Sequence, residues 1–219
     1  MWIRYIEVSQ REMGLTFLSL AGSIFGDMIC QACHRTTSGV LCVSCRGQIR
    51  PASDRILDGG IRLIAAYEHS GPARTLVHHP KYRGVLDFAS MAAEKLAERI
   101  PPVSLIPVLR AWSRRLRYGV DPAQVLAQRL SALTGLPVLN ALRAPVHSVR
   151  RAGGDHSRPD SRFAIRHLPD RPVQIVDDVV TTGRTVASVV DALGENRVLA
   201  VVAANATNPM SSLLCPSRI

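Results

Sequence analysis

VQIVDDVVTTGRT, residues 173–185, is the stretch of this chain from which the fold is predicted. Its first four residues are mostly apolar and predict a short buried strand at 173–176, which Asp177 and Asp178 follow directly. Small and hydroxylated residues then surround Gly183. Beyond them, apolar residues recur at i, i+3, i+4 and i+7, the spacing of one helix face: Val186, Val189, Val190 and Leu193. The stretch therefore predicts a strand, an acidic pair, a loop and a helix, in that order.

The loop and the helix start together predict a phosphate site. The first amides of a helix lack partners inside the helix and carry partial positive charge, so they favour an anion. Glycine lets the backbone approach an oxygen closely, and residues 179–185 contain no acid. The candidate phosphate-binding residues are Val179, Val180, Thr181, Thr182, Gly183, Arg184 and Thr185. The alternative is an ordinary polar turn, but adjacent acids at a strand end are costly without a ligand or cation.

This stretch resembles the 5-phosphoribosyl 1-diphosphate (PRPP) signature of type I phosphoribosyltransferases, which has an apolar strand, Asp-Asp and a loop ending in Thr-Gly-x-Thr. The resemblance implies that Asp177 and Asp178 are the catalytic acids and hold the ribose 2- and 3-hydroxyls, directly or through Mg²⁺-bound water. It also implies that the loop from Thr181 to Thr185 holds the 5-phosphate.

Composition indicates a globular chain with a strong positive charge. The 219 residues are 47% hydrophobic and 20% charged, enough for one ordinary domain and a small appendage. The net charge of +10 raises the possibility of a nucleic-acid partner such as single-stranded DNA. However, only Lys81 and Lys95 are lysines, and an arginine skew also arises from genome base composition.

No apolar run is long enough to predict a membrane span. The apolar segment 15–25 is predicted to be an amphipathic helix, with a signal peptide as the alternative.

Four cysteines near the N-terminus have the spacing of a metal site. Cys30-x-x-Cys33 and Cys42-x-x-Cys45 can each present two thiolates to one ion, and four sulfurs form a closed, structural Zn²⁺ shell. Disulfides and an iron–sulfur cluster are the alternatives. Cys215 is predicted to be a plain thiol. Cysteine is otherwise rare in this chain, and cytosolic pairs of this spacing usually hold a metal, which favours zinc over disulfides.

The rest of the chain alternates predicted strands with predicted helices. Apolar runs predict strands at 61–67, 103–108, 136–139 and 198–204. Helices are predicted at 72–77, at 86–100, and after the N-cap Asp121, this last with a core face of Leu126, Ala127, Leu130 and Leu133. This order predicts an α/β fold with a mostly parallel sheet flanked by helices. Ligands of such sheets bind at the carboxyl ends of the strands.

Three further segments of the chain are rich in basic residues. Arginines follow the strand at 103–108 and predict a loop that binds a polyanion, with a solvent-facing basic helix as the alternative: Arg110, Arg114, Arg115 and Arg117. The segment 81–84, which contains Lys81, is predicted to be a basic loop, either a solvated turn or a ligand contact. Arginines and a Gly-Gly pair in 143–162 predict a mobile lid.

The cysteine pairs, the 81–84 segment, the arginine run and the PRPP signature, in this order, resemble the competence protein F (ComF) family. The resemblance implies an N-terminal segment at 1–28, a zinc-ribbon-like module at 29–50 and a type I phosphoribosyltransferase-like domain at 56–219, joined by a linker at 50–54. It also implies a bacterial cytoplasmic protein linked to DNA uptake in natural transformation.

Two functions are compatible with these features. The first is an enzyme that transfers phosphoribose from PRPP to a nitrogen nucleophile, with Arg110, Arg114, Arg115 and Lys81 on the diphosphate. The second is a module that binds PRPP or single-stranded DNA without turnover, its zinc module docking a helicase-like partner.

Overall fold

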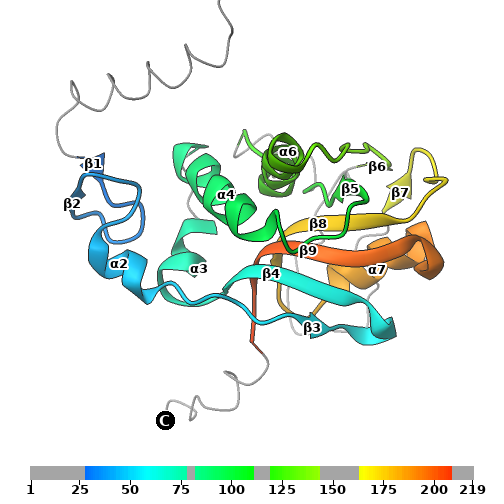
Figure 1. The fold of residues 1–219 in the computed structure, drawn as a ribbon, viewed down its shortest axis with the longest axis horizontal. Helices are drawn as coiled ribbons and strands as arrows, with labels where there is room; N and C mark the ends of the chain where they lie inside the picture. The colour runs from blue at the N-terminus through cyan, green and yellow to red at the C-terminus, as the bar shows by residue number, and fades with distance from the viewer. Residues whose placement is uncertain (1–27, 78–81, 111–118, 144–162, 209–219) are drawn as a thin grey trace, which may run out of the picture.

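The computed structural model describes residues 28–77, 82–110, 119–143 and 163–208, and the side chains of 28 and 82–84 are not among them. Its centre is a five-stranded sheet of order β3-β4-β9-β8-β5 (Figure 1). The strands are β3 (Arg55–Ile56), β4 (Arg62–Glu68), β5 (Ser104–Pro107), β8 (Val173–Val180) and β9 (Val198–Ala206). All neighbours pair in parallel except β3, which is antiparallel to β4.

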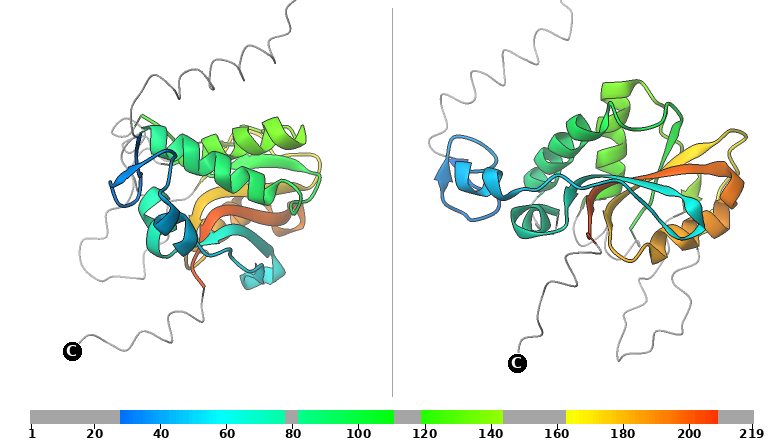
Figure 2. Two further views of the ribbon diagram at one scale, coloured as in Figure 1. Left: turned by 60° about the vertical axis from the view of Figure 1, so that its left-hand side comes forward. Right: turned by 60° about the horizontal axis from the view of Figure 1, so that its bottom comes forward.

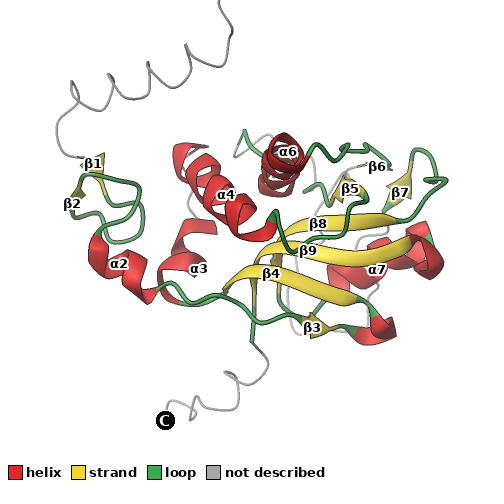
Figure 3. Cartoon of the chain, viewed as in Figure 1, coloured by secondary structure: helices red, strands yellow, loops and turns green. Residues whose placement is uncertain are grey.

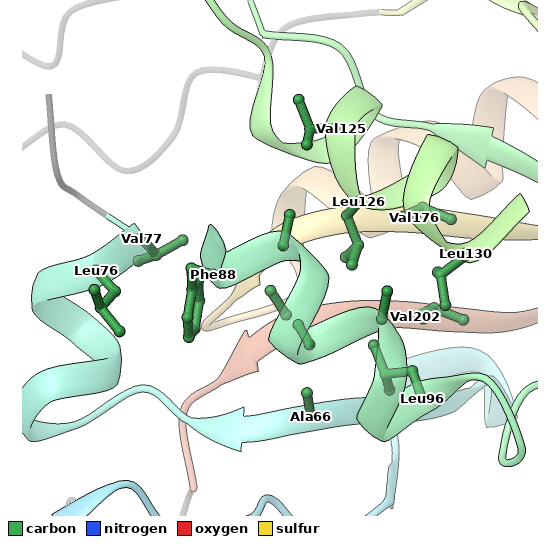
Figure 4. Close-up of a cluster of buried hydrophobic side chains, with 14 of the residues drawn as sticks. Ala66, Leu76, Val77, Phe88, Leu96, Val125, Leu126, Leu130, Val176 and Val202 are labelled. Atoms are coloured by element: carbon green, nitrogen blue, oxygen red, sulfur yellow. The ribbon is translucent and has the colours of Figure 1, made fainter. Parts of the chain in front are cut away.

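Helices cover both faces of the sheet. One buried cluster joins the sheet to α3 (Gly71–Val77), α4 (Tyr82–Leu96) and α6 (Pro122–Thr134). Figure 4 shows this layer, with Phe88, Leu126 and Val202 among its side chains. The other cluster joins the opposite face to α7 (Arg184–Leu193) through the predicted stripe Val186, Val189, Val190 and Leu193. The predicted fold class, a mostly parallel sheet flanked by helices, is therefore confirmed.

The cysteines form a small module at one end of the molecule, next to α3 (Figure 2). It contains β1 (Met28–Ile29) paired with β2 (Thr36–Thr37), followed by α2 (Val43–Gln48). Cys30, Leu41 and Cys45 belong to the same buried cluster as Leu76 of α3. The module therefore shares its core with the helical layer of the sheet.

Short elements complete the fold (Figure 3). The strands β6 (Leu142–Arg143) and β7 (Ala164–Ile165) form a separate antiparallel pair, and 3-10 turns lie at η1 (Asp58–Gly60) and η2 (Glu195–Arg197). None of the helices within the described ranges is long and apolar enough to cross a membrane.

The boundaries of several predicted elements were wrong. The strand of the signature does not end at 176 but continues to Val180, so the acids lie inside β8. The segment 82–84 is the first turn of α4 and not a loop, and that helix ends at Leu96 and not at 100. Only one residue of the predicted strand 136–139 is bridged, Val138 with Leu105. Pro137 in that run has no amide proton to donate, which shortens the pairing.

Two further expectations also differ from the structure. The predicted linker 50–54 lies along β4, because Pro51 bridges Tyr67 and the Ala52 amide donates to Ala66 O at 3.2 Å. Leu133 is exposed in the last turn of α6 and does not face the core. Helical periodicity identifies a face, but it does not tell where the surface packed against that face ends.

Some predicted features lie outside the described residues. They are the N-terminal segment up to residue 27, Lys81, Arg114, Arg115, Arg117, most of the predicted lid (144–162) and Cys215.

Candidate phosphate site and cysteine cluster

Asp177 and Asp178 lie in the last half of β8, near its carboxyl end. Their neighbours on β9 are small, since Asp177 pairs with Ala203. The backbone amide of Asp178 donates to Asp177 Oδ1 at 2.8 Å, so the first carboxyl group folds back onto the second residue. The two acids are therefore linked by a local hydrogen bond.

Asp177 is only 6% exposed. Burial raises the pKa of its carboxyl group well above the usual value, and the neighbouring charge of Asp178 raises it further. Arg110 acts in the opposite direction and lowers this pKa, but less strongly. The protein therefore holds a proton on Asp177 to higher pH than an exposed carboxyl group would.

Arg110 joins the acid pair from the next strand. It follows β5, which pairs in parallel with β8, so both strands deliver their last residues to the same edge. The Arg110 guanidinium forms an ion pair with Asp178 Oδ2, and both side chains are largely shielded from water, at 25% and 15% exposure. The Arg110 backbone amide donates to Asp121 Oδ2 at 2.8 Å.

Asp121 therefore has a different role from the predicted one. It occupies the N-cap position of α6, but its side chain makes no capping hydrogen bond and instead accepts from Arg110. This contact ties the residue after β5 to the start of α6. Sequence reasoning identified the position correctly and the partner wrongly, because a carboxylate at a helix start can accept from any amide that the tertiary fold brings to it.

The turn between β8 and α7 consists of Thr181, Thr182 and Gly183. Gly183 is the N-cap of α7, with φ 76° and ψ 0°, a left-handed conformation that glycine adopts without strain. No side chain caps this helix. The turn therefore exposes helix N-terminal amides in a stretch without acids, as a phosphate site requires.

The predicted loop 179–185 is shorter in the structure. Val179 and Val180 are strand residues, and Arg184 and Thr185 begin α7, which leaves 181–183 as the turn. Val180 is buried in the core, so its side chain is not a ligand contact.

Arg55 is a residue of this region that sequence reasoning missed. Its Nη2 donates to the carbonyl oxygen of Thr181 at 3.0 Å across 126 positions of sequence. Nothing in the sequence near Arg55 indicated this contact, because it depends on the antiparallel strand β3 at the sheet edge.

A small cavity lies beside Asp178, between the sheet and the helices α3, α4 and α6. Its volume is about 10 Å³, and apolar side chains including Phe88 and Leu126 line it. That volume holds about one water molecule and is too small for a sugar.

The four predicted metal ligands form a cluster. The sulfurs of Cys30, Cys33, Cys42 and Cys45 all lie within 4.8 Å of one another, and all four cysteines are free thiols. Four sulfurs around one Zn²⁺ at about 2.3 Å would be about 3.8 Å apart, and Cys33 and Cys42 Sγ are 3.6 Å apart. The cluster could thus bind a single metal ion such as Zn²⁺. The disulfide alternative does not fit the four free thiols.

The thiols differ in acidity because their surroundings differ. A hydrogen bond from Arg35 lowers the pKa of Cys33 to about 6, and burial raises the pKa of Cys45 to about 12. Burial also acts to raise the pKa of Cys30, but hydrogen bonds from backbone amides outweigh it and the net shift is downward. Amides and an arginine directed at the sulfurs favour thiolates, which are the form that binds a metal.

Comparisons with known proteins find matches among solved structures alone. A scan against protein-family models finds no match, and a search of curated proteins finds none either. Among solved structures, the chain is similar to the purine phosphoribosyltransferase from Pyrococcus horikoshii Ot3, with 24% identity over 57% of this chain and 73% of that chain. The TM-score of 0.33 is low, and the fold class follows from the sheet and helices of this structure.

Proposed function

We propose that this protein binds PRPP or a related phosphoribosyl ligand at the carboxyl ends of β8 and β5. The observation that carries the proposal is the arrangement of acidic, hydroxylated and basic residues at this edge of the sheet. A largely shielded acid pair near the end of β8 is followed, after Val179 and Val180, by an acid-free threonine–glycine turn at the start of α7, and Arg110 approaches the pair from β5. The resemblance of residues 173–185 to the PRPP signature supports the same ligand.

Each part of the ligand has a matching group in this proposal. Asp177 and Asp178 accept hydrogen bonds from the ribose hydroxyls, and the amides and hydroxyls of the 181–183 turn bind the 5-phosphate. Mg²⁺, a hard cation that prefers oxygen ligands, would enter with the diphosphate and neutralise part of its charge. Arg114, Arg115 and Lys81 are proposed diphosphate contacts from sequence, and they lie outside the described residues.

Arg110 has two alternative partners in this scheme. Without ligand it neutralises Asp178, which is otherwise a largely buried charge. A diphosphate group offers the guanidinium a second, more highly charged anion. Binding would then exchange the Arg110–Asp178 ion pair for an arginine–diphosphate contact and leave Asp178 to the sugar.

If the protein is an enzyme, the reaction is phosphoribosyl transfer. The bond between ribose C1 and the diphosphate oxygen breaks, and the diphosphate leaves with the electron pair. A nitrogen nucleophile forms the new bond to C1 and then loses its proton to water. The two acids would stabilise positive charge on the ribose ring, and Arg110 would stabilise the leaving group.

The alternative is binding without turnover. In this alternative the same groups bind the ligand, with Arg110 beside Asp178, but no acceptor is used. The net charge of +10 suits a phosphate backbone such as that of single-stranded DNA. The ComF resemblance would place this protein in the cytoplasm, in DNA uptake, with structural Zn²⁺ on the four cysteines and a helicase-like partner.

The test compares the wild type with the double variant D177N/D178N in PRPP and Mg²⁺. At a ligand concentration of 100 times Kd, binding should add about 2.7 kcal/mol to the stability of the wild type, and the double variant should lose this gain. Asp191→Asn removes one carboxylate from the exposed side of α7 and should keep the gain. A wild type without stabilisation at saturating PRPP would overturn the proposal.

A second measurement separates the two functions. Diphosphate release is followed with PRPP, Mg²⁺ and a panel of nitrogenous bases and amines. Release with one acceptor identifies an enzyme, whereas stabilisation by PRPP without release from any member of the panel supports the binding module.

A further inference from the structure

Arg55 contacts the 181–183 turn from a distant part of the sheet. In the sheet order, β4 and β9 separate β3 from β8, so the two strands do not touch (Figure 1). The chain leaves β8 and passes to α7 on the opposite face from α3, α4 and α6. On this path the turn comes within reach of β3, and Arg55 Nη2 donates to Thr181 O at 3.0 Å.

This hydrogen bond fixes the direction of a peptide unit. The peptide bonds of the described residues are all trans, and in a trans peptide the C=O and N–H groups point in opposite directions. With the Thr181 carbonyl held toward Arg55, the amide of Thr182 must point away from Arg55. Among the described residues this amide donates to no protein acceptor. The hydrogen bond from Arg55 thus directs the Thr182 amide out of the turn.

Arg55 also brings charge to the turn. The ion pairs within the described ranges use Asp54 and Asp178, and none involves Arg55. Its Nε is buried and has no hydrogen-bond partner there. A half-buried guanidinium without a carboxylate raises the local potential of an already acid-free turn and favours an anion beside it.

The segment that carries Arg55 is firmly held. Arg55 pairs with Leu63 across the β3–β4 ladder, and the Leu57 amide donates to Ile61 O at 2.9 Å. Asp54, the preceding residue, binds both Arg62 (2.6 Å) and Arg99. Leu57 packs over the turn, since a methyl group added at Gly183 would lie 3.8 Å from its Cδ2.

We infer that Arg55 is a positioning residue of the anion site. It holds the Thr181 carbonyl so that the Thr182 amide is directed at a phosphomonoester dianion, such as the 5-phosphate of a phosphoribosyl ligand. The inference rests on the proposed function for the identity of that ligand, but not for the presence of an anion.

The test uses two smaller ligands, each of which represents one anionic end of PRPP. Ribose 5-phosphate carries the 5-phosphate alone, and inorganic diphosphate with Mg²⁺ represents the other end. Both are titrated calorimetrically into the wild type, Arg55→Gln, Arg55→Lys and the control Arg129→Gln, which removes the same charge from an exposed position on α6. Thermal unfolding establishes that each variant is folded.

Arg55→Gln should weaken ribose 5-phosphate binding by about tenfold, the value of one charge-assisted hydrogen bond, and should leave diphosphate binding unchanged. Arg55→Lys keeps a cationic donor and should restore much of the affinity. The Thr182 amide resonance should shift on titration with inorganic phosphate in the wild type, and should shift much less in Arg55→Gln.

The outcomes distinguish the two proposals. Unchanged ribose 5-phosphate affinity in Arg55→Gln, or an equal loss for diphosphate, overturns the role of Arg55 and leaves PRPP binding intact. A phosphate response at Thr182 that needs Arg55, in a protein that does not bind PRPP, supports the role of Arg55 and refutes the proposed ligand. A wild type that binds neither phosphate nor ribose 5-phosphate overturns the role of Arg55, and one that is also not stabilised by saturating PRPP overturns both.

Discussion

Arg110 and Asp178 form an ion pair that joins the carboxyl ends of β5 and β8, with most of both side chains shielded from water. The pair lies beside Asp177, whose pKa burial raises and Arg110 partly lowers. One arginine therefore neutralises one acid and moderates the proton affinity of the other. This arrangement lowers the cost of two consecutive carboxyl groups near a strand end.

Arg110→Gln should destabilise the protein, because it leaves Asp178 charged, poorly hydrated and unpaired. We expect a loss of about 2 kcal/mol, below the range for fully buried pairs because both groups keep some exposure. Urea unfolding at pH 7 measures the change. The double variant Arg110→Gln, Asp178→Asn should recover part of the loss.

The matched control for this ion pair is Arg62→Gln. Arg62 also pairs with an aspartate, Asp54 at 2.6 Å, but its side chain is 54% exposed. Its loss should cost less than about 1 kcal/mol. Equal losses at Arg110 and Arg62 would mean that burial of the Arg110–Asp178 pair has no energetic consequence.

The extent of β8 shows where sequence reasoning succeeded and where it stopped. The apolar run 173–176 correctly located the strand, and the stripe on α7 correctly identified its buried face. Periodicity ended the strand at Asp177 because charged residues rarely continue a buried run. The structure continues it to Val180, since β9 pairs with it along this length and Arg110 pairs with Asp178.

Contacts between distant segments were the part of the site that the sequence did not reveal. The acid pair, the turn and Arg110 were all predicted, because each lies at the end of a predicted strand. Arg55 was not, because its contact needs the antiparallel strand β3, which β4 and β9 separate from β8 in the sheet. The first turn of α4 was missed because Pro80 and Gly84 favour a loop locally, whereas the helix begins at Tyr82.

Asp177→Asn should stabilise the protein at high pH and have little effect at low pH. The folded protein binds the Asp177 proton more tightly than the unfolded chain, so this stability is complete below about pH 4 and is lost as pH rises through the raised pKa. Asparagine stays neutral and keeps the oxygen that accepts from the Asp178 amide. The difference from wild type should grow by at most about 1.4 kcal/mol per pH unit.

Urea unfolding from pH 4 to 9 tests this dependence, with Asp191→Asn as the control. Asp191 is exposed on α7, and its replacement should shift stability by a small amount at all pH values. A wild type and Asp177→Asn with parallel pH profiles would show that the buried carboxyl group has an ordinary pKa.

Cys45→Ser should release the metal and unfold the cysteine module. Cys45 is 5% exposed and belongs to the buried cluster that joins the module to α3. A hydroxyl is a poor replacement for a thiolate in a four-sulfur site, so zinc content should fall from about one ion per chain to near zero. Elemental analysis and the thermal unfolding midpoint measure the two effects.

Cys215→Ser is the control for the cysteine module, since Cys215 is outside both Cys-x-x-Cys pairs. It should keep both the metal and the unfolding midpoint. Metal retained by Cys45→Ser, or lost equally in both variants, would contradict a site made of these four sulfurs.

Gly183→Ala should weaken ligand binding more than its cost in stability suggests. Space is available, since the added methyl group would lie 3.8 Å from Leu57 Cδ2, but φ of 76° is unfavourable for alanine. The strain is about 1–2 kcal/mol, and relieving it moves the amides of the 181–183 turn. Gly194→Ala is the matched control, because Gly194 has φ 90° at the other end of the same helix. Both variants should unfold at lower urea concentration, and only Gly183→Ala should lose the stabilisation by PRPP and Mg²⁺. If both variants lose it equally, the effect comes from general strain in α7, and the turn has no special part in binding.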